Sequence, residues 1–292
     1  MRSADPWLLL AALALAALSY LLYASYDLMA RRYTGHDLPA RKVLLVAMVS
    51  YAFNLNMGAL VGGAGFRFRL YSRLGLSPAT ITKVLSFSVI SNWGGYVLLV
   101  GLLLSLQQFP VALQWKLGAD ALRWIGVLLL AAAAAYPLLC RLLPSRTWTL
   151  RGHELQLPGW RMALLQVAAS TLNWLTIALI VFLLLPDGVS YPVVLSVLLA
   201  AAVAGAVTHV PAGLGVLEAV FVLALSARLG TSAMLAALLT YRAIYYLLPL
   251  AVAVPVFLYM ERSASRGADR HADERRPGKQ KGPGIAAGAP PS

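Results

Sequence analysis

The chain has 292 residues, of which 60% are hydrophobic and only 12% are charged, whereas an average soluble domain has about 25% charged residues. Its mean hydropathy is +0.74, and its apolar runs of roughly 20 residues can each cross a hydrocarbon core about 30 Å thick. These properties exclude a soluble globular protein. The net charge of +13 is spread over separate loops, which favours contact with anionic lipid over nucleic-acid binding.

Apolar segments recur along the whole chain. They cover residues 7–26, 43–65, 84–106, 121–143, 162–185, 192–229 and 232–260. The first is longer than the apolar region of a usual signal peptide and has no clear cleavage site, so we expect a retained membrane anchor. The pattern predicts an all-α polytopic membrane protein with about five to eight transmembrane helices.

Two of these segments differ from plain membrane spans. Segment 43–65 carries Asn54, Asn56 and four glycines, and segment 192–229 is too long for one span and contains the sequence PAGLG. Irregular backbone at membrane depth is tolerated only where protein or a water-filled cavity satisfies its polar groups. Both segments are therefore predicted to be broken helices or re-entrant hairpins.

Basic residues indicate the topology. They concentrate in loops 27–42, 66–83 and 141–161 and after residue 260. The positive-inside rule places all of these regions in the cytoplasm if both interrupted segments are re-entrant. Five segments then span the membrane, with the N-terminus outside. The competing arrangement of eight full spans puts two of the three basic loops, or one loop and both termini, on the wrong side. We prefer the re-entrant arrangement.

The chain divides into two regions. Residues 1–260 are expected to form the multipass domain, and residues 261–292 a basic, disordered cytoplasmic tail, because the tail has no apolar period. No sequence repeat is visible, but one interrupted segment in each half suggests an inverted-repeat transporter.

The stretch THVPAGLGVLE holds the strongest candidate site. Pro211 is expected to end one helix, and Gly213 and Gly215 permit backbone conformations that other residues disfavour. A new half-helix is predicted to start near Val216, with Glu218 in its first turn. Helix N-termini bind phosphate, and broken-helix transporters use them for anionic substrates. The alternative is that Glu218 only caps its own helix.

Two ionisable residues accompany this break. Arg242 is a lone arginine in an apolar run, so it must pair, reach the interface or line a wet cavity. It is expected either to pair with Glu218 or to bind phosphate, whose geometry its guanidinium matches. His209 lies beside the break and could titrate near neutral pH. Glu218 and His209 are therefore candidates for proton coupling, although His209 could instead be simply hydrogen-bonded.

A second candidate site runs from Ser50 to Ser77. Asn54 is polar at membrane depth, and Arg67, Arg69 and Tyr71 follow among apolar and aromatic residues. Such a mixture suits an anionic lipid headgroup. The alternative is an ordinary basic flank with an aromatic belt.

Several motifs are absent from the sequence. There is no Walker A loop, no HExxH or Cys/His cluster and no GxSxG. We therefore expect no ATP motor, no metal, no cofactor and no enzymatic activity.

The sequences SYAFNLN, GGAGFRFRLYSRLGLS and HVPAGLGVLEAVF resemble the transmembrane domain of bacterial lysylphosphatidylglycerol synthase/flippase proteins, over roughly residues 7–260. In full-length members, this domain is associated with moving aminoacylated phosphatidylglycerol between leaflets, and a separate soluble domain makes that lipid from aminoacyl-tRNA. This chain lacks a matching soluble region and has Ala212 where the motif often has glycine, so synthase activity is not expected. The positions that the resemblance assigns to substrate binding are Asn54, Arg67, Arg69, Tyr71, Pro211, Gly213, Gly215 and Glu218.

Together these observations predict a bacterial inner-membrane protein that binds and flips an anionic or aminoacylated phospholipid. The two broken segments are expected to meet in a cavity. Two alternatives are a non-transporting membrane subunit with a lipid-synthesis enzyme as its partner, and a small-solute transporter.

Overall fold

The computed structural model describes residues 5–109, 118–143, 147–150, 153–208, 210 and 213–274. Side chains are described in all of these ranges except 147–150, 153–156 and 263–274. His209 and Pro211, both named as candidate site residues, lie outside the described residues.

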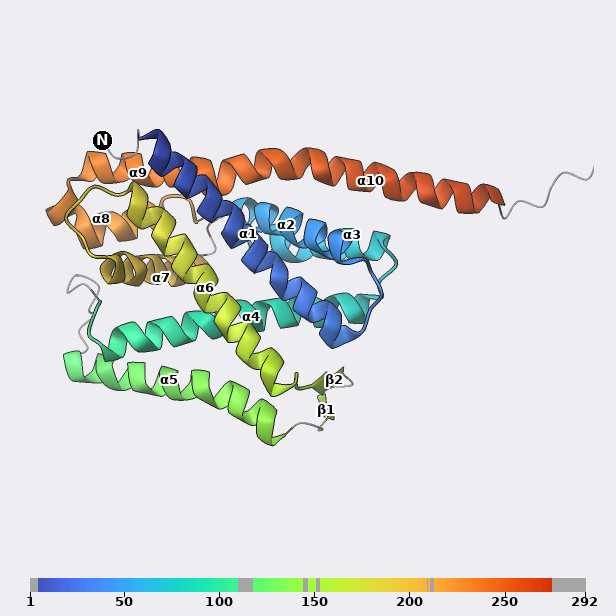
Figure 1. Cartoon of the computed structure of the whole chain (residues 1–292), viewed down its shortest axis with the longest axis horizontal. Helices are drawn as coiled ribbons and strands as arrows, with labels where there is room; N and C mark the ends of the chain where they lie inside the picture. Colours follow the sequence, from blue (N-terminus) through green and yellow to red (C-terminus); the bar gives the residue numbers. More distant parts are fainter. Residues whose placement is uncertain are drawn as a thin grey trace, which may run out of the picture.

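The chain is almost entirely helical (Figure 1). In order, the elements are α1 (Pro6–Thr34), α2 (Ala40–Met57), the π-helix η2 (Ala59–Gly65), α3 (Phe66–Arg73), α4 (Pro78–Ser105), α5 (Ala119–Leu142), β1 (Thr147–Leu150), β2 (His153–Gln156), α6 (Trp160–Leu184), α7 (Tyr191–Thr208), α8 (Val216–Leu229), α9 (Thr231–Arg242), the π-helix η5 (Ala243–Leu247) and α10 (Leu248–Glu274). The predicted all-α class is confirmed. The one addition is the antiparallel ribbon of β1 and β2, in a loop that was not expected to form strands.

Six helices of the described chain are long and apolar enough to cross a membrane, within the predicted range of five to eight. They are α1, α4, α5, α6, α7 and the composite helix Thr231–Arg262. Several begin or end beyond the apolar segments. Helix α1 continues to Thr34, and α4 begins at Pro78, where the side chain of Ser77 caps it. Polar end turns of this kind lie outside an apolar segment, so apolar content alone places helix ends too far inward.

The first interrupted segment is a helical hairpin. Helix α2 ends at Met57, and Gly58 adopts a φ of +84° before η2 begins. The chain then folds back closely, since a Cβ atom on Gly62 would lie 2.1 Å from the carbonyl oxygen of Phe53. Only glycine permits this approach, and the predicted break in this segment is confirmed. That the segment is re-entrant in the membrane stays a prediction.

The second interrupted segment is also a hairpin, formed by α7 and α8, which lie side by side (Figure 1). Gly188, just before α7, lies beside Leu229, the last residue of α8, because a Cβ on Gly188 would be 3.4 Å from the Leu229 Cδ2 atom. Both ends of this hairpin are therefore at the same end of the molecule. Its tip lies between Thr208 and Val216.

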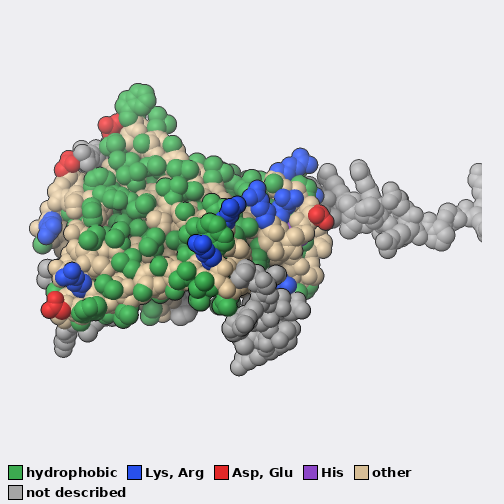
Figure 2. Space-filling view, turned by 60° about the horizontal axis from the view of Figure 1, so that its bottom comes forward, with side chains coloured by type: hydrophobic (Ala, Val, Ile, Leu, Met, Phe, Trp, Pro, Cys, Tyr) green, Lys and Arg blue, Asp and Glu red, His purple; other side chains and the backbone are tan. Residues whose placement is uncertain are grey.

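The two hairpins enter the molecule from opposite ends (Figure 1). The α2–η2 hairpin starts from the end where α3 joins α4, and the α7–α8 hairpin starts from the end where α6 joins α7. Figure 2 shows most of the visible lysines and arginines toward the first of these ends, with an apolar surface between the two ends. This arrangement fits the re-entrant interpretation, in which α7 is a hairpin arm, but α7 is also long and apolar enough to span, which gives one candidate span more than the five of that interpretation. The orientation in the membrane remains a prediction.

Helix α10 corrects one boundary. The disordered tail was expected to begin at residue 261, but α10 remains helical to Glu274. The segment from Glu261 contains helix-forming Glu, Arg and Ala residues, and such residues support a helix without any apolar period. Residues 275–292 lie outside the described part of the chain.

Candidate functional site

A cavity of about 280 Å³ lies where the tips of the two hairpins meet. It is lined by Tyr51, Asn54, Leu55 and Gly58 of the first hairpin, by Leu198, Ala201, Ala202, Gly205, Ala206, Val210, Gly213, Val216 and Leu217 of the second, and by Trp174, Ile177, Tyr241, Tyr245 and Tyr246. This volume is near the lower end of the range for small-molecule sites, about 300–1,000 Å³. The two broken segments do meet in a cavity, as the sequence predicts.

Helix α8 starts at Val216, the residue at which the half-helix was predicted to begin, and Glu218 lies in its first turn. The break before it needs positive φ angles of +55° at Gly213 and +77° at Gly215, a conformation that favours glycine. The N–H groups at the start of α8 have no backbone carbonyl partners within their own helix, and the Glu218 carboxylate interacts with the N–H groups of Gly215 and Glu218, as the capping alternative expects. They therefore form the half-helix end that the sequence predicts, and Val216 at that end lines the cavity.

Arg242, the last residue of α9, holds this break together. Its Nε atom donates to Oε1 of Glu218, and its Nη2 atom donates to Glu218 Oε2 at 3.0 Å and to the carbonyl oxygen of Gly213 at 2.8 Å. The side chains of Arg242 and Glu218 are only 10% and 16% exposed. A carbonyl freed by the helix break is thus satisfied by the same guanidinium that neutralises the carboxylate. The predicted ion pair is present.

The positive charge of Arg242 also reaches the cavity wall. Its guanidinium carbon lies 5.2 Å from the centroid of the Tyr246 ring, which lines the cavity. Among the described residues of the lining, none is Asp, Glu, Lys or Arg. The charges that adjoin the cavity at the break are therefore those of Arg242 and Glu218, which neutralise each other.

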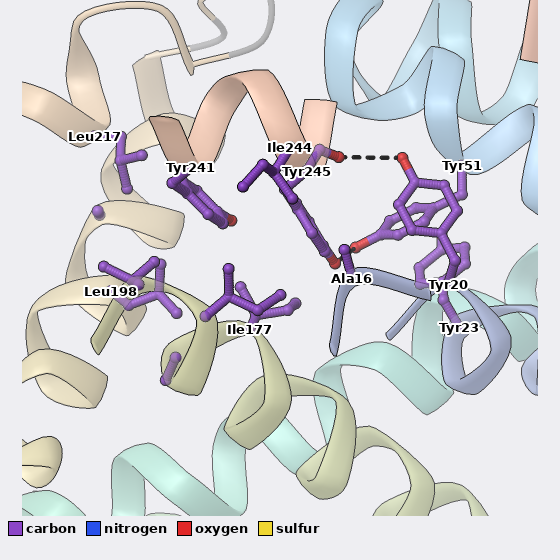
Figure 3. Packing of buried hydrophobic residues seen from close by; sticks show 14 of the residues in the cluster. Ala16, Tyr20, Tyr23, Tyr51, Ile177, Leu198, Leu217, Tyr241, Ile244 and Tyr245 are labelled. Atoms are coloured by element: carbon purple, nitrogen blue, oxygen red, sulfur yellow. Dashed lines mark hydrogen bonds between the residues drawn. The ribbon is translucent and has the colours of Figure 1, made fainter. Parts of the chain in front are cut away.

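Tyrosine side chains form one wall of the cavity. The Tyr245 hydroxyl is 2.9 Å from the hydroxyl of Tyr51 and 2.6 Å from that of Ser19, and the Ser19 hydroxyl donates to Oδ1 of Asn173 at 2.6 Å. Tyr241 stacks on Tyr245, with ring centroids 5.4 Å apart. Figure 3 shows these rings side by side, between apolar residues of α6, α7 and α8 and the rings of α1 and α2. Hydroxyl contacts fix the positions of rings that the apolar pattern alone does not locate.

The predicted site residues fall into two groups. Asn54 and Gly213 line the cavity, and Gly215, Glu218 and Arg242 adjoin it through the break. The remaining described candidates, Arg67, Arg69 and Tyr71, are on α3 and do not line it.

Helix α3 is held by two different carboxylates. Arg67 is 2% exposed and pairs with Asp27 of α1, whose Oδ2 atom also accepts from the hydroxyl of Tyr71 at 2.9 Å. Arg69 is exposed and donates to Glu261 of α10 at 2.9 and 3.0 Å, and these hydrogen bonds raise its pKa. Arg67 and Tyr71 thus connect α3 to α1 through Asp27, whereas the side chain of Arg69 is exposed to solvent.

Asp27 was missed as a site of interest, because it was placed in a loop after the first apolar segment. It is fully buried, and its carboxylate accepts four hydrogen bonds: two from Arg67, one from Tyr71 and one from Ser88. The available signal was a lone acid directly after a 20-residue apolar run, a position where a carboxylate needs a partner.

The whole transmembrane region has known relatives. Residues 1–253 match the protein family described as the lysylphosphatidylglycerol synthase TM region. The chain is 43% identical to the inner membrane protein YbhN of Escherichia coli over 259 residues, which cover 88% of this chain and 81% of that protein. It is 31% identical to an uncharacterized protein of Synechocystis, over 92% of this chain and 82% of the relative.

A more distant relative is the phosphatidylglycerol lysyltransferase of Staphylococcus haemolyticus. It is 23% identical over 266 residues, which are 89% of this chain but only 30% of that protein.

Proposed function

Because the chain belongs to the family of lysylphosphatidylglycerol synthase transmembrane regions, we propose that it binds the headgroup of a membrane phospholipid between its hairpin tips and moves the lipid between leaflets. The observation that carries this proposal is the cavity, since hairpins entering from opposite ends both line it. A headgroup bound there would contact both hairpins. The acyl chains could stay in the bilayer, so only the headgroup needs a polar path.

Arg242 and the start of α8 are the proposed phosphate contacts. Arg242 already makes a forked contact with the Glu218 carboxylate, and a guanidinium binds phosphate with the same geometry. A phosphate would therefore exchange with Glu218, which is then released. Glu218 and His209 are the proposed groups for proton coupling. Without coupling, movement would be downhill.

The α3 residues have different proposed roles. Arg69 is exposed at the end of the molecule toward which basic residues gather, which suits first contact with an anionic headgroup. Arg67 and Tyr71 hold α3 against α1 through Asp27. We propose that this end faces the cytoplasm of a bacterial inner membrane.

Replacing Arg242 by Ala is expected to slow lipid movement about 10-fold or more, because a hydrogen bond to a charged group is worth about 1.5–3 kcal/mol. The measurement is movement of fluorescent phospholipids across vesicles that contain the purified protein. Arg242→Lys keeps the positive charge but loses the forked contact, and its rate of lipid movement is expected to lie between those of the wild type and Arg242→Ala. Glu218→Gln tests the exchange partner and is also expected to slow movement.

The matched control is Arg228→Ala, because Arg228 is exposed at the other end of α8. It is expected to retain the wild-type rate. Thermal melting first establishes that Arg242→Ala and Arg242→Lys are folded. If these folded variants move lipid as fast as the wild-type protein, the site assignment is wrong.

A second candidate function is a non-transporting subunit beside a lipid-synthesis enzyme. The observation that favours it is the lysyltransferase relative, in which the matching region is only 30% of the protein. This hypothesis predicts stable co-purification with such an enzyme, and no lipid movement by the chain alone.

A further inference from the structure

We propose that the aromatic wall of the cavity is a site for an ammonium group, so that the preferred ligand is a phospholipid headgroup with both a phosphate and an ammonium and no net charge. This inference rests on the proposed function, since it identifies the class of lipid that the same cavity takes.

Five aromatic residues from four elements line the cavity: Tyr51, Trp174, Tyr241, Tyr245 and Tyr246. The three tyrosines of α9 and η5 lie close together, with ring centroids 5.4, 5.7 and 5.9 Å apart. An aromatic face attracts an ammonium or guanidinium within about 6 Å of its centroid. The Tyr246 ring already has such a neighbour in Arg242, so one ring of this wall already holds a cation and the other rings are left for a ligand.

The hydroxyls of two of these tyrosines are already occupied. Tyr245 and Tyr51 bind each other, and Tyr245 also binds Ser19. Trp174 likewise directs its indole N–H to the carbonyl oxygen of Asn92, at 3.2 Å. These polar groups are therefore engaged with the protein. Tyr51 also stacks on Tyr23, and Tyr245 on Tyr241, so a ligand can meet only the ring surface that lines the cavity.

Charge balance selects among possible ligands. Arg242 and Glu218, beside the cavity, neutralise each other, and the described lining residues include no Asp, Glu, Lys or Arg. An uncompensated charge inside a membrane is costly. A phosphate that takes Arg242 releases the Glu218 carboxylate, and an ammonium on the same headgroup restores neutrality. A headgroup with phosphate alone leaves one negative charge uncompensated.

The test compares lipids labelled on an acyl chain, because a label on the amine would remove the positive charge. Phosphatidylethanolamine and phosphatidylcholine carry the ammonium, and phosphatidylglycerol does not. Vesicles with the purified full-length protein are expected to move the first two lipids faster than the third. Equal rates for all three lipids would overturn the ammonium site.

The variants separate ring chemistry from packing. Tyr241→Leu and Trp174→Leu are expected to slow the ammonium lipids about 2- to 30-fold, the range for loss of one cation–π contact, and to leave phosphatidylglycerol unchanged. Tyr241→Phe and Trp174→Phe retain an aromatic face and are expected to recover most of the rate. Equal slowing of all three lipids by the Leu variants would show a packing role and overturn the proposal.

A binding measurement separates this proposal from the proposed function. Short-chain phosphatidylethanolamine and phosphatidylglycerol are titrated into the protein in detergent, beside soluble phosphoethanolamine as a headgroup without acyl chains. Preference for the ethanolamine lipid by a protein that moves no lipid would refute transport and retain the ammonium site. No preference would overturn that site. Stronger binding of free phosphoethanolamine than of the lipid would assign the same chemistry to a soluble ligand and overturn the lipid assignment.

Discussion

Replacing Asp27 by Asn is expected to lower the free energy of unfolding by about 3–5 kcal/mol, the usual cost of breaking a buried ion pair by removing one partner. Asp27 is fully buried, and Arg67 approaches it through Nε and Nη2 at 3.1 and 3.2 Å. An amide in place of the carboxylate directs an NH₂ group at one of these donors and leaves the guanidinium charge without a counter-charge. The measurement is denaturant or thermal unfolding of the purified protein in detergent.

Two further variants show whether the loss of stability comes from the broken ion pair. Asp37→Asn makes the same chemical change at an exposed position in the loop after α1, and it is expected to stay within about 0.5 kcal/mol of the wild type. The double replacement Asp27→Leu with Arg67→Met removes both charges and is expected to recover part of the stability, because an apolar pair of similar volume often replaces a buried ion pair without cost. Recovery is incomplete because the hydroxyls of Tyr71 and Ser88 lose their acceptor. An Asp27→Asn protein as stable as the wild type would show that this cluster does not hold α3 to α1.

The same double variant also tests the predicted substrate role of Arg67. The structure shows Arg67 paired and buried, outside the lining of the cavity. If the double variant is stable and still moves lipid at the wild-type rate, Arg67 acts through structure alone. A stable variant that moves no lipid would support a direct role for Arg67.

The sequence predicted the features that rest on backbone chemistry. Glycine and proline within long apolar segments identified both hairpins, and the spacing from Gly215 to Glu218 located the start of α8. The ion pair of Glu218 and Arg242 was also predictable, since few charged residues occur in that half of the chain. In each case, the membrane leaves few ways to satisfy a polar group.

The remaining features depend on which face of each helix meets another helix. In an apolar span, lipid-facing and protein-facing residues are similarly hydrophobic, so periodicity indicates little about packing. The aromatic wall was therefore not predicted, because it joins Tyr51 of α2 to Tyr245 of η5, 194 residues apart. Asp27 was missed for a related reason. From the sequence alone, an acid at the edge of an apolar run is expected to be solvated. Only the packing of α3 and α4 against it shows that it is buried.

Replacing Gly95 by Ala is expected to have the second large effect, because α4 crosses α6 at this glycine with no room for a side chain. A Cβ atom there would lie 2.2 Å from the backbone nitrogen of Thr171 and 2.6 Å from the hydroxyl of Ser170. The obstruction is mostly backbone, so the helices must move apart. Overpacking of this kind typically costs about 1–3 kcal/mol and occasionally more.

Gly94 provides the matched control, because it is the neighbouring residue on the same helix and has room for a Cβ atom. A Cβ on Gly94 would meet its nearest atom, in the Val167 side chain, at 3.4 Å. Gly94→Ala is expected to leave the melting temperature unchanged or raise it, since Ala favours helix over Gly by about 1 kcal/mol.

The crossing of α4 and α6 also positions Trp174, which donates to Asn92 on α4 and lines the cavity. Gly95→Ala should therefore slow lipid movement as well as lower the melting temperature. Equal melting temperatures for the two variants would mean that α4 and α6 do not cross as closely as this geometry requires.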